Sequence, residues 1–210
     1  MGKLIRCITS DGTVMASAID STDIVAKSEQ IHKTSAVTTA ALGRLLTATS
    51  MMGNSLKGEK NTLTVKIDGG GPAGVLTAVS DSSGNVRGYV TNPIVEIPPK
   101  ENGKLDVSGA VGTNGNVFVM KDMGLKEPYN GLVPIASGEI AEDITSYYAV
   151  SEQIPTVCAL GVLVNPDLTV KKAGGYLIQL LPAADEDTVT RLEENIKKMR
   201  PVTEPVSYTH

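Results

Sequence analysis

Hydrophobic and polar residues alternate along several short stretches of this chain, as they do in β-strands that bury one face. The first stretch, residues 3–20, contains two apolar runs separated by Ser10, Asp11 and Gly12, which favour a hairpin turn. Alternation returns in LTVKID, GVLTAVSD and NVRGYV, which are joined by the turn-forming sequences DGGGPAG and SSGN. Together these three segments predict an antiparallel meander.

Further strands are predicted later in the chain. Residues 104–111 and 116–121 flank Asn114 and Gly115, a pair typical of tight hairpin turns, so these two segments are predicted to form a second hairpin. The segments TVCALGVLVN and GGYLIQLLP are apolar enough to predict strands that are covered on both faces.

Small and apolar residues at helical spacing predict two helices between Thr22 and Gly53. The second helix, from about Ser35 to Met52, carries Arg44 as its only charge. A helix that is small or apolar nearly all round is usually buried on most sides. We therefore expect this helix to lie in the core.

A third helix is predicted from residue 138 to 150, with Glu139, Glu142 and Asp143 in its first turns. The spacing of Glu139 and Asp143 places them on one helical face, where two carboxylates can bind a cation or act as an acid and base pair. Acids at a helix start more often serve only the helix dipole. Both interpretations remain open at this point.

After Pro182 the sequence becomes highly charged and predicts a helix from Asp185 to Arg200, followed by a tail that we expect to be disordered. The apolar residues of this helix form a narrow stripe, which needs a partner surface. The stripe consists of Val189, Leu192, Ile196 and Met199. It either packs on its own globule or docks on a second subunit.

The composition of the 210-residue chain narrows the classes of function. A hydrophobic fraction of 41% with 20% charged residues supports a sizeable core and excludes a disordered chain. The formal net charge of −4, with no cluster of Lys and Arg, excludes the electrostatic footprint of nucleic-acid or anionic-membrane binding. No apolar run reaches membrane-spanning length and no export signal is present, so we expect a cytoplasmic protein.

Searches for catalytic and cofactor motifs are negative. Residues 69–74 match G-x-G-x-x-G, but Pro72 removes an amide that would face a pyrophosphate, and a strand-like segment follows where a helix is required. No Walker loop is present. His32 and His210 cannot form a triad or a multi-histidine zinc site. We therefore assign no catalytic, cofactor-binding or metal-binding residue.

The two cysteines, Cys7 and Cys158, lie in apolar stretches and are predicted to be buried structural thiols. They would form a disulfide only if the fold brought them together. A reducing compartment makes that the minority case.

Several longer strings identify a family. The strings LTVKIDGGGPAGVLTAVSDSSGNVRGYVTNP, GKLDVSGAVG, KDMGLKEPYNGLVPIASGEIAEDITSYYAVSEQIP and AGGYLIQLLP resemble, in the same order, the core of the redox-regulated 33-kDa heat-shock chaperone family. The resemblance runs from about Leu4 to Arg200. It implies an α+β fold in which antiparallel sheets pack around a largely buried central helix, followed by a helical C-terminal arm.

The resemblance also implies a division of the chain into a core domain, residues 1–182, and an arm, residues 183–210. One departure is large: the family's C-terminal zinc module, with its C-x-C and C-x-x-C thiolates, is absent from this sequence. Cys7 and Cys158 do not match those pairs, so no redox-switch residue is carried over and no cofactor is expected. The sequence is either the core of a longer protein or a natural form without the sensor.

The implied function is that of an ATP-independent holdase that binds unfolding proteins under oxidative or heat stress. Without the zinc switch we expect constitutive or redox-insensitive activity. The expected partners are unfolded client proteins and, through the arm, a second copy of the chain, with neither nucleic acid nor membrane. Two alternatives are a structural dimerisation module without holdase activity and a small-molecule enzyme that uses Glu139 and Asp143.

Overall fold

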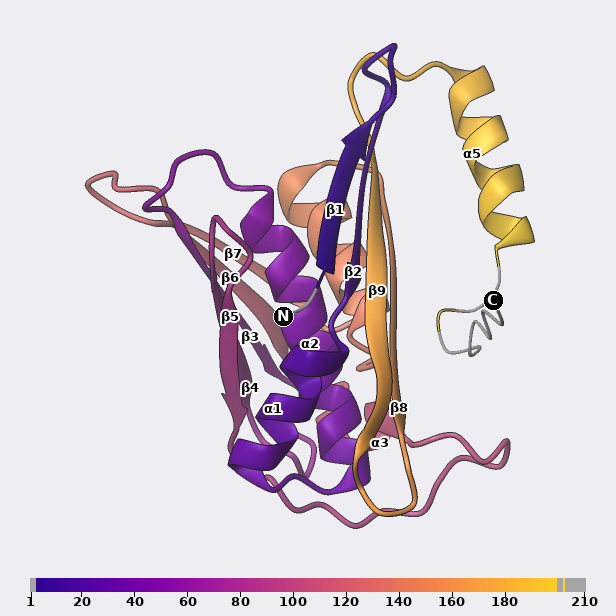
Figure 1. Ribbon diagram of the computed structural model, residues 1–210. Helices are drawn as coiled ribbons and strands as arrows, with labels where there is room; N and C mark the ends of the chain where they lie inside the picture. The colour runs from indigo at the N-terminus through magenta and orange to yellow at the C-terminus, as the bar shows by residue number, and fades with distance from the viewer. Residues whose placement is uncertain (1–2, 200–201, 203–210) are drawn as a thin grey trace.

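A computed structural model describes residues 3–199 and residue 202 of the chain. Two antiparallel sheets lie on either side of helix α2 (Ala36–Asn54), which runs through the centre of the molecule (Figure 1). This arrangement confirms the predicted α+β class with a largely buried central helix.

The first sheet has four strands in the order β1-β2-β9-β8. Its members are β1 (Lys3–Ile8), β2 (Val14–Asp20), β8 (Thr156–Val164) and β9 (Val170–Leu180). The predicted N-terminal hairpin is confirmed, because β1 pairs antiparallel with β2. The long strand β9 then joins that hairpin to β8, near the other end of the chain.

The second sheet has five strands in the order β5-β4-β3-β6-β7. Its members are β3 (Thr62–Asp68), β4 (Leu76–Asp81), β5 (Val86–Val90), β6 (Asn116–Asp122) and β7 (Tyr129–Pro134). The predicted meander of three segments is confirmed as β3, β4 and β5. Both neighbours of β6 are antiparallel to it.

The prediction of a strand over residues 104–111, and with it the second hairpin, is wrong. Residues 107–111 form the short helix α3 (Val107–Val111). The carboxylate of Asp106 accepts a hydrogen bond of 3.0 Å from the backbone N–H of Gly109, which caps the helix start. Local capping therefore overrides the strand-like alternation, and β6 pairs with β3 and β7 instead.

The glycine-rich turn that imitates a dinucleotide motif serves to pack α3. The backbone N–H of Gly71 donates to the carbonyl of Val111 at 2.9 Å. A Cβ atom on Gly69 would lie 2.3 Å from the carbonyl oxygen of Gly112, and one on Gly71 would lie 2.4 Å from the carbonyl carbon of Val111. Glycine is required here because the two backbones approach so closely.

Helix α2 supplies the centre of the core. Sixteen of its nineteen residues are buried, as its single charge predicts. It packs against strands of both sheets and against helix α1 (Thr22–His32). Each fully buried Leu or Met side chain contributes about 1.5–3 kcal/mol to folding, so this helix is a main source of stability.

The third predicted helix begins later than expected. Helix α4 (Ala141–Tyr147) continues directly into a single π-helical turn, η1 (Tyr148–Glu152). Helix α5 (Glu186–Lys198) confirms the predicted C-terminal helix, capped by Asp185, whose carboxylate accepts from the Thr188 N–H at 2.8 Å. Arg200 and, apart from Val202, the predicted disordered tail lie outside the described residues. Within the part of the chain that is described, no helix is long and apolar enough to cross a membrane.

Candidate functional site

Most of the outer face of the four-stranded sheet is apolar. One set of alternating side chains from this sheet, which includes Ser17, Ile19 and Leu177, is buried toward α2. The opposite set points away from α2 and defines what we call the outer sheet face. It consists of the apolar members of that set, Ile5, Cys7, Val14, Ala16, Ala18, Val157, Ala159, Tyr176, Ile178 and Leu180; the same set carries the charged residues Lys3, Asp20 and Lys172 at one end of the sheet.

The strand register aligns these side chains into rows. Cys7 lies opposite Ala16, which lies opposite Ile178, which lies opposite Val157. Most of the face is half-buried, while Ile5 is 55% exposed. An antiparallel sheet with one solvated face normally presents polar residues there. A continuous apolar outer face is typical of a surface that contacts other proteins.

Helix α5 carries the stripe that the sequence singled out. Val189, Leu192 and Ile196 are half-buried and Met199 is 46% exposed, so none of the four belongs to the core. Figure 1 places α5 beside the four-stranded sheet, on the side away from α2. The stripe therefore retains apolar surface that the described residues do not cover.

The prediction that both cysteines are buried is wrong for Cys7, which is exposed on the edge strand β1. Burial raises the pKa of the Cys158 thiol to about 12. Both thiols are free. Cys7 and Cys158 lie in the two outermost strands of the sheet, three strand spacings or about 14 Å apart. This separation exceeds the roughly 7 Å that a disulfide can span between Cα atoms.

The structure separates Glu139 from Asp143, so the prediction of a shared helical face is wrong. Glu139 precedes α4 and accepts from Arg44 Nη1 at 2.6 Å, while its other oxygen pairs with Lys100 Nζ at 2.5 Å. Burial disfavours the Glu139 carboxylate, but the hydrogen bonds and charges of Lys100 and Arg44 outweigh it and hold its pKa below the usual value. Glu139 is therefore a structural anion that neutralises the only charge of α2.

Asp143 is a structural cap. Its fully buried carboxylate accepts from the backbone N–H groups of Ala136, Ser137 and Gly138 at 2.9, 2.9 and 3.2 Å, and from that of Ile140 at 2.8 Å. Ile140 has a φ of 69°, which is rare for a β-branched residue. The carboxylate holds this strained turn in place, with three hydrogen bonds to Oδ1 and one to Oδ2.

A second buried polar cluster, which sequence reasoning missed, joins η1 to the five-stranded sheet. Glu152 accepts from Lys121 Nζ at 2.7 Å and from the hydroxyl of Tyr147. Burial raises the pKa of Tyr147, so this phenol remains a hydrogen-bond donor. The members come from two segments, because Lys121 lies in β6 while Tyr147 and Glu152 lie in α4 and η1, and no local pattern in the sequence links the two.

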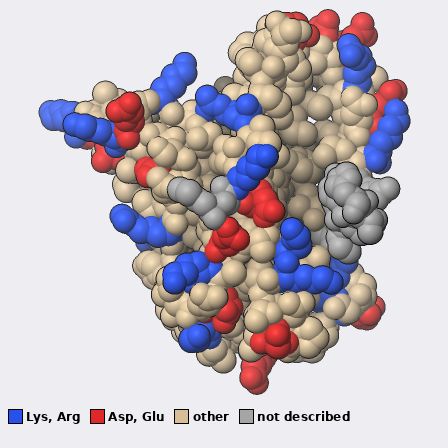
Figure 2. Space-filling model, viewed as in Figure 1, with Lys and Arg blue, Asp and Glu red and all other residues tan. Residues whose placement is uncertain are grey.

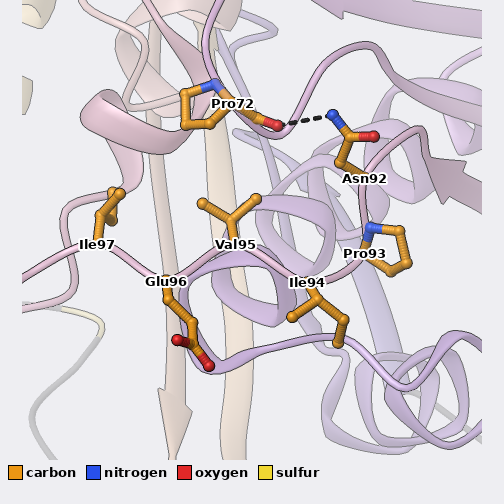
Figure 3. Close-up of a pocket in the computed structure, with 7 residues that line it drawn as sticks. All are labelled: Pro72, Asn92, Pro93, Ile94, Val95, Glu96 and Ile97. Carbon is orange, nitrogen blue, oxygen red and sulfur yellow. Dashed lines mark hydrogen bonds between the residues drawn. The ribbon is translucent and has the colours of Figure 1, made fainter.

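Neither of two cavities assembles a catalytic constellation. A shallow cavity of about 420 Å³ is lined by Pro72 and residues 92–97, with Glu96 as its only charged member (Figure 3). Its one polar link is the hydrogen bond of 2.8 Å from Asn92 Nδ2 to the Pro72 carbonyl. A second cavity of about 810 Å³ lies between α2 and β8, and the ion pair of Arg44 and Glu139 lines it.

The residues present do not fit a thiolate zinc site. Over residues 3–199 and 202, no group of three or more His, Cys, Asp or Glu is close enough to hold a metal ion. His32 instead pairs through Nε2 with the Gly88 carbonyl at 2.9 Å, and His210 lies outside the described residues. Basic and acidic side chains are interspersed on the side of the molecule seen in Figure 2, with no broad patch of one sign.

Comparisons with known proteins assign the family. The family model for Hsp33 protein matches residues 2–209. The 33 kDa chaperonins of Geobacillus kaustophilus and Clostridioides difficile are each 52% identical over 200 residues, which cover 95% of this chain and 68% of theirs. The crystal structure of the 33 kDa chaperonin from Thermotoga maritima superposes with a TM-score of 0.90 at 40% identity, covering 95% of this chain and 68% of that one. The chain therefore belongs to the Hsp33 family and is a chaperone rather than an enzyme.

Proposed function

We propose that this chain is an ATP-independent holdase that binds unfolding proteins in the cytoplasm under oxidative or heat stress. The observation that carries the proposal is the outer sheet face, whose apolar rows run across all four strands. Unfolded proteins expose apolar segments, and burying apolar surface lowers the free energy by roughly 25 cal/mol per Å². Such contacts need no nucleotide, in agreement with the missing Walker loop.

We further propose that residues 1–182 form the core domain and residues 183–210 the arm. The stripe Val189, Leu192, Ile196 and Met199 then joins two copies into a homodimer or extends the client surface. Its half-buried state supports this role, because a narrow amphipathic stripe is stable only against a partner.

Activity is proposed to be independent of peroxide. The distance between β1 and β8 prevents an internal disulfide between Cys7 and Cys158. The raised pKa of Cys158 keeps that thiol protonated, and thiols in this state are poor targets for oxidation. Oxidation of Cys7 alone adds a polar group at the margin of the outer sheet face and gives no switch.

Light scattering of chemically unfolded citrate synthase, diluted into ATP-free buffer with this chain, tests the proposal. We expect equal suppression of aggregation in reductant and after mild peroxide. Ile178→Lys, on the outer sheet face, should abolish most of the suppression. Leu125→Lys, an equally drastic change at a residue that is 66% exposed outside the four-stranded sheet, is the matched control.

The outcomes of this assay distinguish the proposed function from its alternatives. If Ile178→Lys and Leu125→Lys weaken the suppression of aggregation equally, the client surface is not the outer sheet face. A gain after peroxide would overturn redox insensitivity. Dimer formation without any suppression would favour the alternative of a structural dimerisation module.

A further inference from the structure

The strand β1 forms one edge of the four-stranded sheet and pairs only with β2. Five of its six residues are exposed. The opposite edge strand, β8, has α4 packed against it. In the other sheet the edge strand β7 has α4 and η1 packed against it, and the edge strand β5 has α1 and α2. Among the edges that the structure describes, β1 is therefore the least covered.

The hydrogen-bond pattern shows which backbone groups of β1 are free for pairing. Thr9 N–H donates to the Val14 carbonyl at 2.9 Å, and Leu181 N–H donates to the Thr13 carbonyl at 2.8 Å. Even-numbered residues of β2 therefore bond to β1, and odd-numbered residues bond to β9. In β1 the groups of residues 3, 5 and 7 face β2. Those of Leu4, Arg6 and Ile8 face outward at regular spacing.

Several protections that natural edge strands usually carry are missing from β1. It contains no proline, and its register with β2 shows no bulge. Its side chains include Ile5 and Ile8, which are 55% and 60% exposed. An exposed edge with apolar side chains is a template for another strand. The charged residues Lys3 and Arg6 are both cationic, so they favour segments that carry acids.

We propose that β1 captures clients by strand addition, and this inference rests on the proposed holdase function. An extended apolar segment of an unfolding protein, carrying acidic residues, pairs with the outward backbone groups of Leu4, Arg6 and Ile8. It becomes a fifth strand of the sheet. Its alternate side chains continue the outer sheet face beyond Ile5 and Cys7. Backbone pairing also explains how one surface accepts clients of unrelated sequence.

A second copy of β1 fits this edge less well than a client segment. Antiparallel pairing of two copies through all three outward positions places Arg6 opposite Arg6. Like charges directly opposite each other on neighbouring strands are destabilising. A client segment with an acid at that position gains an attraction instead.

The substitution Arg6→Pro tests the inference against Arg6→Ala. Proline removes the outward N–H without removing a ladder bond to β2, and edge strands tolerate proline in this orientation. Both changes remove the hydrogen bond of 2.7 Å from Arg6 Nη1 to the Asn54 carbonyl, and only proline blocks pairing. The probe is a peptide of alternating valine and threonine flanked by aspartates, with binding followed by fluorescence anisotropy.

We expect Arg6→Pro to weaken peptide binding about tenfold relative to Arg6→Ala, because one hydrogen bond is lost and the proline ring obstructs its neighbour. The native fold of both variants is checked by circular dichroism. As a measurement on the unaltered chain, the same peptide with N-methyl groups along one edge should bind about tenfold more weakly than the unmethylated peptide. This comparison holds even where Arg6→Pro fails to fold.

The outcomes separate this inference from the holdase itself. If the unaltered chain suppresses citrate synthase aggregation but proline, alanine and N-methylation have equal effects, strand addition is wrong and the holdase function stands. If light scattering shows a dimer that Arg6→Pro alone dissociates, the occupant of the edge is a second copy and the inference is overturned. If the unaltered chain does not suppress aggregation at all, the proposed holdase function itself is refuted, and strand addition falls with it.

Discussion

Removing the carboxylate of Asp143 should cost this protein much of its stability. In Asp143→Ala the four backbone donors that the carboxylate satisfies lose their partner. The hydrogen bonds from Gly138 and Ile140 are buried, and each orphaned buried donor costs about 1–3 kcal/mol. The N–H groups of Ala136 and Ser137 are more accessible to water, so their loss adds about 0.5–1.5 kcal/mol each.

The expected loss for Asp143→Ala is therefore about 3–9 kcal/mol, a large share of the roughly 5–15 kcal/mol that stabilises a typical domain. The strain at Ile140, with its φ of 69°, is relieved if the turn relaxes without the carboxylate, and such relaxation would place the loss toward the lower end of this range. In Asp143→Asn the amide oxygen can take the place of Oδ1 and accept from Ala136, Ser137 and Gly138. The amide nitrogen replaces Oδ2 and cannot accept from the Ile140 N–H, so that hydrogen bond is lost. We expect about half the effect.

Urea unfolding followed by far-ultraviolet circular dichroism measures the series. Glu142→Ala, at the neighbouring exposed acid in the same helical turn, is the control and should change the free energy of unfolding by less than about 0.5 kcal/mol. An Asp143→Ala protein within about 1 kcal/mol of the unaltered chain would refute the capping argument. Equal effects of alanine and asparagine would refute the counting of acceptors.

Three further predictions follow from the site. A thiolate-selective disulfide reagent should label Cys7 in the native protein and Cys158 only on unfolding, because Cys7 is exposed and burial raises the pKa of Cys158 to about 12; equal labelling rates would contradict this. The folded pKa of Glu139 is lowered from 4.5, so its contribution is present above about pH 4.5 and is lost as pH falls through the lowered folded value. Urea titrations below that pH should therefore show that the free energy of unfolding falls less steeply with decreasing pH in Glu139→Gln than in the unaltered chain. An equal fall in both proteins would show that ionisation of Glu139 does not contribute to stability. Leu192→Asp should lower the molecular mass measured by light scattering if the stripe joins two copies, while Glu193→Gln on the exposed side should leave it unchanged.

The central helix and the meander could be predicted because their patterns are local. A helix with Arg44 as its only charge indicates burial on all sides wherever it lies, and the alternation from residue 62 to 90 indicates strands that pair with their neighbours in sequence. The wrong predictions depend on distant partners. Residues 107–111 form a helix whose start is capped by Asp106 and whose last carbonyl, that of Val111, accepts from the Gly71 N–H. Cys7 is exposed because β1 lies at an edge of the sheet, and the local alternation of residues does not predict the order of strands in a sheet.

The candidate site likewise has one part that local sequence predicts and one part that depends on distant partners. The stripe of α5 was predictable, because helical spacing makes it visible in one segment. The outer sheet face was not predicted, although β2 and β9 carry a usable signal: in VMASAID and GGYLIQL both alternate sets of side chains are small or apolar except for Asp20 and Gln179. Only the strand order shows that these sets form one continuous surface.

The four-stranded sheet joins the two ends of the described chain, and this has a consequence for synthesis on the ribosome. Val14 of β2 lies opposite Leu180 of β9. Strand β2 therefore cannot pair with β9 until about 165 further residues have been translated. At roughly 5–20 residues per second, this delay is on the order of ten to thirty seconds. During that interval the N-terminal hairpin exposes two unpaired edges and both of its apolar faces. The nascent chain of this chaperone therefore itself resembles a client.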